Sequence, residues 1–252
     1  MREQNVPPPS TSALRLWSLP LWPLPLIAGL LPCVGSLLAL AISLTLDLIP
    51  ACNPFIDGCV SVSRAARHDL ANHVFRAFTL PGATLQGLTW IVVAFWLRQF
   101  APMHRRSLRV LPWLGAVAAI ALVAYGTFLG TDGQTYRWLR QYGTVLYFGF
   151  TGIAMIIAGG AIREAATAQR LHAPWRLDSA LLALAALLVT LGVVNAVIGP
   201  LFDAATKDRI ENVTEWWASL IFTLVFVVVT AVAARSRATV TVATRIAEPG
   251  AG

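Results

Sequence analysis

The sequence contains very little charge. Only 12% of its 252 residues are Asp, Glu, Lys or Arg, whereas about 25% are charged in an ordinary soluble domain. Hydrophobic residues make up 57% of the chain, which excludes a disordered protein, because disorder requires low hydrophobicity and high charge. The same composition argues against a water-soluble globule and predicts an integral membrane protein.

Charge is absent altogether from six stretches, each long enough for the ~20 apolar residues of a membrane-crossing helix. They are Leu16–Leu46, Ala77–Leu97, Val110–Thr131, Gln141–Ile162, Ser179–Phe202 and Trp216–Ala234. Apolar residues do not alternate with polar ones in them, which favours helices over barrel strands. Prolines between 19 and 25 disfavour regular helix, so the first span is expected to begin at 26. The predicted fold is an all-α, polytopic bundle of six transmembrane helices within a membrane domain at 19–234, with spans at 26–46, 77–97, 110–131, 141–162, 179–202 and 216–234.

Lys and Arg are distributed unevenly between alternate loops. Twelve of the 19 basic residues fall in one set, which includes both termini, while eight of the 12 acidic residues fall in the other. Because cytoplasmic loops are enriched in Lys and Arg, both termini are expected in the cytoplasm, as mobile polar tails at 1–18 and 235–252. The basic residues are dispersed among short loops, so nucleic acid is not an expected partner. The expected location is a plasma (inner) membrane if the source is bacterial.

Cysteine is scarce, with three in the chain. Cys52 and Cys59 enclose the turn-forming pairs Asn-Pro and Asp-Gly in the long first outer loop, on the side where oxidising conditions are usual. A Cys52–Cys59 disulfide is therefore geometrically allowed, and the sequence leaves open whether it forms. Zinc bound by Cys52, Cys59, His68 and His73 is the competing interpretation, but the spacing lacks the short Cys-x-x-Cys pair of structural sites. We predict no metal site and no cofactor.

The rest of the first loop is rich in polar side chains. The spacing from 64 to 76 is helical, which would place His68, Asn72 and Arg76 on one face and Asp69 and His73 on an adjoining one. One interpretation is that Asp69 caps a helix and the others face water. The other interpretation is a site for a charged lipid headgroup or for acid–base chemistry.

The last outer loop supplies acidic residues. Glu211 and Glu215 would share one face of the last helix if it begins early, and they would repel each other unless a cation or proton intervenes. Trp216 and Trp217 fit the aromatic belt at a membrane interface. We expect a carboxylate at this edge to lie opposite an Arg or His of the first loop.

The six spans contain no Asp, Glu, Lys, Arg or His. This absence counts against an ion-coupled transporter, which keeps ionisable residues at membrane depth. Gln86 and Asn195 are expected to form hydrogen bonds between helices. Small residues on the fourth span are expected to allow close helix packing; they are Gly149, Gly152, Gly159 and Gly160.

Three features together resemble the FRAG/DRAM/Sfk family. They are the six spans with both ends inside, the first loop Asn53-Pro54-Phe55-Ile56-Asp57-Gly58-Cys59 continued by Ser61-x-Ser63, and Glu211-x-x-x-Glu215-Trp216 at the start of the last span. That family includes the damage-regulated autophagy modulators and a factor that remodels GPI anchors. The segment from Pro54 to Asp57 looks like the family's Pro-aromatic-Ile-Ser-Asp motif without its serine. The resemblance implies a lipid-related role near the outer leaflet, with no agreed catalytic residues.

Three functions are consistent with these observations. The leading hypothesis is a protein that binds or organises membrane lipid in a polar pocket formed by outer loops 1 and 5, through Asn53, Asp57, Arg64, His68, Asn72, His73, Arg76, Glu211 and Glu215. An alternative is a lipid-modifying enzyme of the GPI or phospholipid remodelling type, with catalytic candidates His68, His73, Asp57, Asp69 and Glu215. No nucleophile elbow or zinc-protease motif accompanies them, which argues against the enzyme. The third hypothesis is a scaffold for other membrane proteins.

Overall fold

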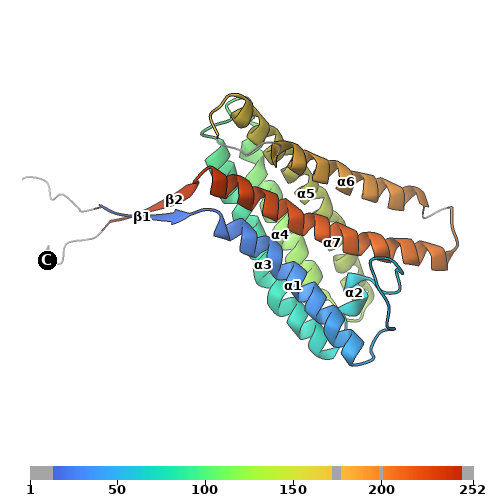
Figure 1. Ribbon diagram of the computed structural model, residues 1–252. Coiled ribbons are helices and arrows are strands. Elements are labelled where there is room, and N and C mark those ends of the chain that lie inside the picture. Colours follow the sequence, from blue (N-terminus) through green and yellow to red (C-terminus); the bar gives the residue numbers. More distant parts are fainter. Residues whose placement is uncertain (1–13, 172–176, 199–200, 246–252) are drawn as a thin grey trace, which may run out of the picture.

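The computed structural model describes residues 14–171, 177–198 and 201–245 (Figure 1). Its six long helices are α1 (Pro23–Thr45), α3 (Asp69–Leu97), α4 (Ser107–Phe128), α5 (Gln134–Thr167), α6 (Leu177–Ile198) and α7 (Ala204–Arg235). A short helix, α2 (Val62–Ala65), lies in the first loop, and there are two strands, β1 (Leu14–Pro20) and β2 (Thr239–Arg245). Each of the six long helices contains a stretch apolar and long enough to cross a membrane. The predicted all-α bundle of six spans is confirmed.

The six long helices form a closed ring. Each packs against the next long helix along the chain, and α7 completes the ring against α1. Because each long helix runs from one end of the bundle to the other, neighbouring helices are antiparallel (Figure 1). Inside the ring, Trp90 on α3 and Phe226 on α7 are buried and lie 5.6 Å apart between ring centroids. This interior contains the candidate site.

Several helices begin earlier than the hydropathy pattern predicts. α3 begins at Asp69 rather than 77, α5 at Gln134 rather than 141, and α7 at Ala204 rather than 216. The Asp203 side chain explains the start of α7, because it accepts hydrogen bonds from two free backbone amides of the first turn. α1 begins at Pro23 rather than 26, since a proline in the first helical position needs no amide partner.

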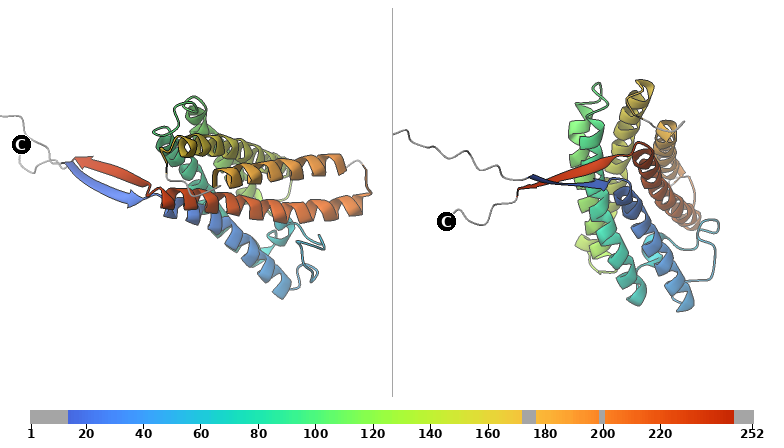
Figure 2. Two further views of the ribbon diagram at one scale, coloured as in Figure 1. Left: turned by 45° about the horizontal axis from the view of Figure 1, so that its top comes forward. Right: turned by 60° about the vertical axis from the view of Figure 1, so that its left-hand side comes forward.

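β1 and β2 pair as an antiparallel ribbon, in register from Leu14 opposite Arg245 to Pro20 opposite Thr239. Figure 2 shows this ribbon projecting from one end of the bundle, which we call the ribbon end; the opposite end, which carries the first loop, is the loop end. Residues 14–18 and 239–245 of the expected polar tails therefore form paired strands. The alternation Thr-Val-Thr-Val at 239–242 favours a strand. The outer tail segments 1–13 and 246–252 lie outside the described residues.

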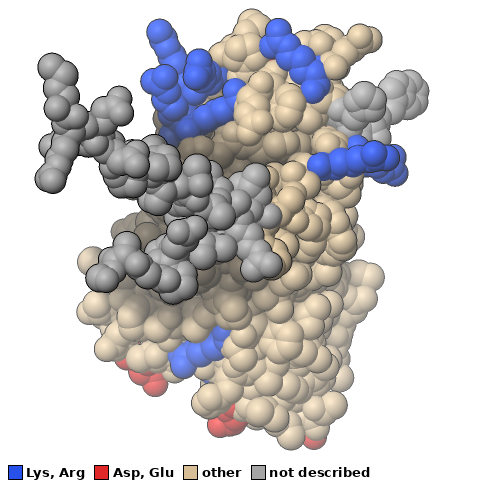
Figure 3. Space-filling model, turned by 90° about the vertical axis from the view of Figure 1, so that its left-hand side faces the viewer, with Lys and Arg blue, Asp and Glu red and all other residues tan. Residues whose placement is uncertain are grey.

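Charge separates between the two ends as the loop count predicts. In the view from the ribbon end, Lys and Arg gather over part of the face, and the few visible Asp and Glu lie at its lower edge (Figure 3). Arginines in or next to the connections at the ribbon end are Arg98, Arg105, Arg106, Arg109, Arg163, Arg170, Arg235 and Arg237. The described termini emerge on this same basic end (Figure 1).

Candidate functional site

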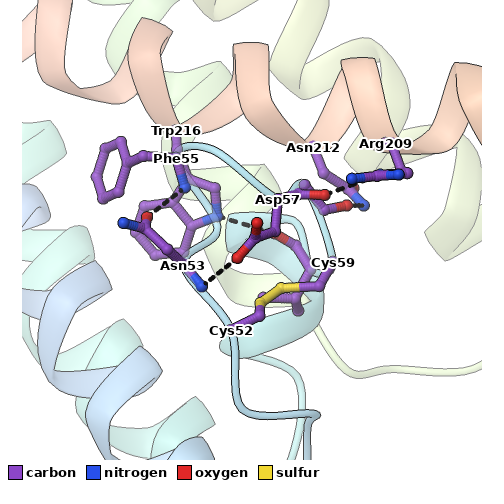
Figure 4. Close-up of a disulfide and its surroundings, with 10 residues drawn as sticks. Cys52, Asn53, Phe55, Asp57, Cys59, Arg209, Asn212 and Trp216 are labelled. Carbon is purple, nitrogen blue, oxygen red and sulfur yellow. Dashed lines mark hydrogen bonds between the residues drawn. A yellow bond between two sulfur atoms is a disulfide. The ribbon is translucent and has the colours of Figure 1, made fainter.

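The first loop folds back on itself between Cys52 and Cys59. Asn53 Oδ1 accepts a hydrogen bond from the Phe55 amide at 3.1 Å, and Asp57 Oδ2 accepts one from the Asn53 amide at 2.9 Å. The Cys52–Cys59 disulfide, with Cα atoms 6.6 Å apart, closes this turn (Figure 4). The predicted turn is confirmed, and the disulfide that the sequence left open is present. Asn53 and Asp57, two of the candidate ligand-binding residues, therefore hold the loop's own backbone.

The zinc interpretation does not fit this geometry. Cys52 and Cys59 are bonded to each other, whereas zinc takes cysteine as a free thiolate. Over the part of the chain that the structure describes, no group of three or more His, Cys, Asp or Glu is placed to hold a metal ion.

The folded loop is fastened to the beginning of α7. Arg209 Nε donates to the Asp57 carbonyl oxygen at 2.9 Å, and Asn212 Nδ2 donates to that of Gly58 at 2.8 Å. Trp216 Nε1 donates to the carbonyl oxygen of Val60 at 2.9 Å. These donors are three or four residues apart, so they form one stripe along α7 (Figure 4). The stripe satisfies carbonyls that a buried loop would otherwise leave unpaired.

Aromatic packing strengthens the same attachment. The Phe55 ring lies 5.3 Å from the ring of Trp216 and 5.9 Å from that of Trp217. Trp217 Nε1 also donates to the Phe55 carbonyl oxygen at 3.2 Å. The two tryptophans predicted as an interfacial belt thus also bind the first loop.

Gly58 allows the loop to approach α7 closely. Its φ of +62° is in the left-handed region, which glycine adopts without steric cost. A Cβ atom at this position would overlap the carbonyl oxygen of Arg209 and lie 2.9 Å from its carbonyl carbon. Both the turn and the contact with α7 therefore require glycine.

The helix expected from 64 to 76 is interrupted. α2 ends at Ala65, and α3 begins at Asp69 with a φ of +45°. The buried Asn72 side chain donates to the carbonyl oxygens of Ala66 at 2.9 Å and Leu129 at 3.1 Å. In a continuous helix, a backbone amide would donate to the Ala66 carbonyl instead. Asp69 does not cap this helix as expected. The N-cap residue of α3 is His68, and its side chain forms no capping hydrogen bond.

The predicted polar cluster is therefore divided. Arg76 joins Asn72 in holding the end of α4, donating to the carbonyl oxygens of Gly126 at 3.1 Å and Leu129 at 2.6 Å. His68 and His73 are exposed, and His73 Nδ1 lies 2.8 Å from the backbone oxygen of Asp69 on its own helix.

Two further candidates lie on the surface. Arg64 approaches Asp208 at 3.8 Å, and Glu211 approaches Lys207 at 3.7 Å. Both pairs are solvent-exposed, where an ion pair contributes only about 0–1 kcal/mol. The Arg64–Asp208 pair joins the first loop to α7, whereas the Lys207–Glu211 pair lies within α7.

Glu215 is different because it lines a cavity in the bundle. Its Oε1 accepts a hydrogen bond from the Ser63 amide at 3.2 Å, and the Arg64 guanidinium lies close enough to act on the carboxylate electrostatically. A carboxylate of the last helix therefore contacts the first loop, through the Ser63 amide and beside Arg64 rather than beside a histidine.

The cavity has a volume of about 80 Å³. Its lining on α7 runs from Glu215 to Thr223, which at 1.5 Å per residue is a length of about 12 Å; we call it the crevice. Apolar walls come mainly from Pro32, Phe75, Leu122, Phe148 and Phe222. Polar side chains are interspersed, namely Ser36, Thr79, Gln86, Tyr125, Thr144, Tyr147, Ser219 and Thr223. The crevice thus runs from a carboxylate under the loop towards the middle of the ring.

A buried hydrogen-bonded pair lies at the inner part of the crevice. Tyr147 Oη donates to Gln86 Oε1 at 2.9 Å, and Gln86 Nε2 donates to the Ala28 carbonyl oxygen at 3.1 Å. The predicted interhelical role of Gln86 is confirmed. Thr79 also lines the crevice and is 1% exposed, and its hydroxyl has no hydrogen-bond partner among the described residues.

The other predictions for the spans have mixed outcomes. Asn195 Nδ2 donates to Thr214 Oγ1 at 2.7 Å, which confirms an interhelical bond between α6 and α7. A Cβ at Gly159 would lie 2.9 Å from Leu182, so close packing is confirmed there. At Gly149 nothing lies within 4 Å, so that glycine does not serve helix packing within the described residues.

Apart from Glu215 and Gln86, the polar residues inside the ring were missed by sequence reasoning, although one signal was present. Glu215, Ser219 and Thr223 follow one another at intervals of four, a polar stripe down one helix face. Tyr125 and Thr79 come from other helices, and no local pattern relates them to this stripe. No known family, curated protein or solved structure matches the chain. The crevice and its loop are the features that bear on function.

Proposed function

We propose that the protein binds a membrane lipid in the crevice. The polar end of the lipid lies beside Glu215 under the first loop, and one chain extends between the helices. The observation that supports this proposal is the combination of a carboxylate at one end of the crevice with mostly apolar walls along its length. An amphiphile has the same two parts in the same order.

The size of the crevice favours one chain rather than a whole phospholipid. A volume of about 80 Å³, spread over a length of about 12 Å, is narrow. It suits a single unbranched chain, or several waters at about 10–15 Å³ each. We propose the chain, because most of the surface that faces the crevice is apolar.

The carboxylate favours a headgroup that donates hydrogen bonds. Oε1 of Glu215 already accepts from the Ser63 amide, which leaves Oε2 for a ligand. A positive charge beside a carboxyl group favours its ionised form, which accepts hydrogen bonds and does not donate them. We therefore propose a lipid that presents an ammonium or hydroxyl group at this point.

The histidines give little support to the enzyme hypothesis. Neither His68 nor His73 lines the crevice, and both are exposed. A catalytic base must come within hydrogen-bonding reach of the reacting group. Lipid binding is therefore the function that we propose in preference to lipid modification.

We also propose how the protein is oriented in the membrane and to which family it belongs. The ribbon end, with its basic excess, faces the cytoplasm, and the membrane is the plasma (inner) membrane if the source is bacterial. Membership of the FRAG/DRAM/Sfk family is likewise a proposal. Its support is the six-span ring with both described termini at one end and the fastened Pro54–Asp57 turn.

The experiment compares the lipids that copurify with the wild-type protein and with Glu215→Gln and Glu211→Gln. The two carboxylates are four residues apart on α7, but Glu211 is exposed and does not line the crevice. Glutamine preserves the acceptor for the Ser63 amide, so the loop should stay attached. Loss of a charge-assisted hydrogen bond should reduce retention of an ammonium- or hydroxyl-bearing lipid about ten-fold in Glu215→Gln, and Glu211→Gln should retain it.

Lipids extracted from the purified proteins are quantified by mass spectrometry against the bulk membrane. If wild-type protein and both variants carry the same lipids in the bulk proportions, the proposal is wrong and the crevice holds water.

A further inference from the structure

A second hollow lies at the ribbon end, far along the bundle from Glu215. Its volume is about 470 Å³, within the range of small-molecule pockets. It is lined by Phe100, Arg170, Leu171, Arg235, Ser236 and Arg237. These residues come from the ends of α3, α5 and α7, so the hollow lies where three membrane helices reach the surface.

Two helix caps of the same kind fix the arginine backbones. Just after α7, Arg237 has a φ of +50°, and the Ala238 amide donates back to the carbonyl oxygen of Ala233 at 2.9 Å. Just after α5, Gln169 has a φ of +54°, and the Arg170 amide donates back to the carbonyl oxygen of Ala165 at 2.9 Å. Both are Schellman-type endings. The positions from which the arginines extend are therefore set by backbone hydrogen bonds.

The charge of this hollow is unbalanced. Arg170, Arg235 and Arg237 have no hydrogen bond or ion pair from their guanidinium groups to any described residue. The C-terminal dipoles of α3, α5 and α7 contribute about −0.5 charge each, against three positive charges. A net positive charge of about 1.5 remains, which an anion would neutralise.

The hollow also has an apolar part. Leu171 is buried and Phe100 is half-buried, and both belong to the lining. Inorganic phosphate cannot make apolar contacts with these two side chains, whereas a phospholipid carries both a phosphate group and apolar chains. Basic pockets between membrane helices on the cytoplasmic side are suited to anionic headgroups.

We propose that this hollow binds the phosphate group of an anionic phospholipid through Arg170, Arg235 and Arg237. The site is separate from the crevice and does not depend on the function proposed for it. It recognises negative charge at the ribbon end, whereas the crevice recognises a hydrogen-bond donor at the loop end.

The test uses the full-length protein in detergent, with binding of phosphatidylglycerol and phosphatidylcholine of matched chains measured by native mass spectrometry. The variant is R170Q/R235Q/R237Q. The matched control is R105Q/R106Q/R109Q, which removes three exposed arginines of the same end that do not line the hollow. The wild type and the control should prefer phosphatidylglycerol, and the first variant should lose at least about ten-fold of that preference.

A third variant, R170K/R235K/R237K, keeps the charge and should keep most of the preference, which guards against misfolding of the glutamine variant. Equal loss in both glutamine triples would overturn the site, because it would show a general attraction of the basic surface. A separate arm adds inorganic phosphate. Displacement of phosphatidylglycerol by phosphate at equal concentration would overturn the assignment to lipid.

Discussion

Replacing Gly58 with alanine should detach the first loop from α7. Gly58 has a φ of +62°, and a residue with a side chain pays about 1–2 kcal/mol for the left-handed region. The new Cβ would also overlap the Arg209 carbonyl group, and overpacking of this kind costs about 1–3 kcal/mol. The expected loss of unfolding free energy is therefore about 2–5 kcal/mol.

The matched control is Gly133→Ala. Gly133 also has a positive φ, +123°, but the nearest atom to its Cβ is a Tyr136 ring carbon at 3.2 Å, which belongs to a side chain. The control should lose only the contribution from backbone strain, which is about 1–3 kcal/mol at a φ of +123° and a ψ of +150°. Denaturant unfolding in detergent micelles measures the free energy, and amide exchange over residues 53–63 reports whether the loop stays attached. Equal destabilisation of the two variants with unchanged exchange in Gly58→Ala would refute the placement of the loop on α7.

Four further predictions concern single side chains. Trp216→Phe should lower the unfolding free energy by about 1–3 kcal/mol, because it leaves a buried carbonyl unpaired; denaturant titration measures this. Cys52→Ser should cost about 2–3 kcal/mol through the lost loop constraint, and reduced wild-type protein should behave in the same way. Hydrogen bonds from the backbone and side chain of Thr206 hold the pKa of Asp203 below its ordinary value, so the cap stabilises α7 above the unfolded-state pKa and is lost as pH falls through the lower folded value. Asp203→Asn should remove this acid dependence from amide exchange at the start of α7. Glu164→Gln should increase amide exchange in the connection between α3 and α4, where its carboxylate accepts two backbone amides and a histidine, and leave residues 53–63 unchanged.

Hydropathy predicts the six spans well because the bilayer allows few alternatives. An uncharged run of about 20 residues has to satisfy its backbone internally, and a helix does this. The starts of α3 and α7 were placed too late because their first turns are polar and extend past the apolar run. The helix starts depend instead on local chemistry, such as the Asp203 cap of α7.

The sequence identified the polar residues of the loop end but did not predict which groups they bind. Arg76 and Asn72 bind backbone oxygens more than 50 residues away, at Leu129, and Asn212 binds Gly58 across the chain. Such pairings arise from tertiary packing, and no spacing in the sequence encodes them. Glu215 was identified correctly as facing the first loop, because it lies at the edge of the last span on the same side as that loop.

The central claim is that a lipid chain occupies the crevice beside Glu215. A photoreactive amino acid in place of Ser219, which lines the crevice, is compared with one in place of Leu224, which is 41% exposed on the outer surface of α7. After illumination in native membranes, the cross-linked lipids are identified by mass spectrometry. The account predicts one selected lipid class at Ser219 and the bulk lipid mixture at Leu224. Absence of lipid at Ser219, or the bulk mixture at both positions, would contradict it.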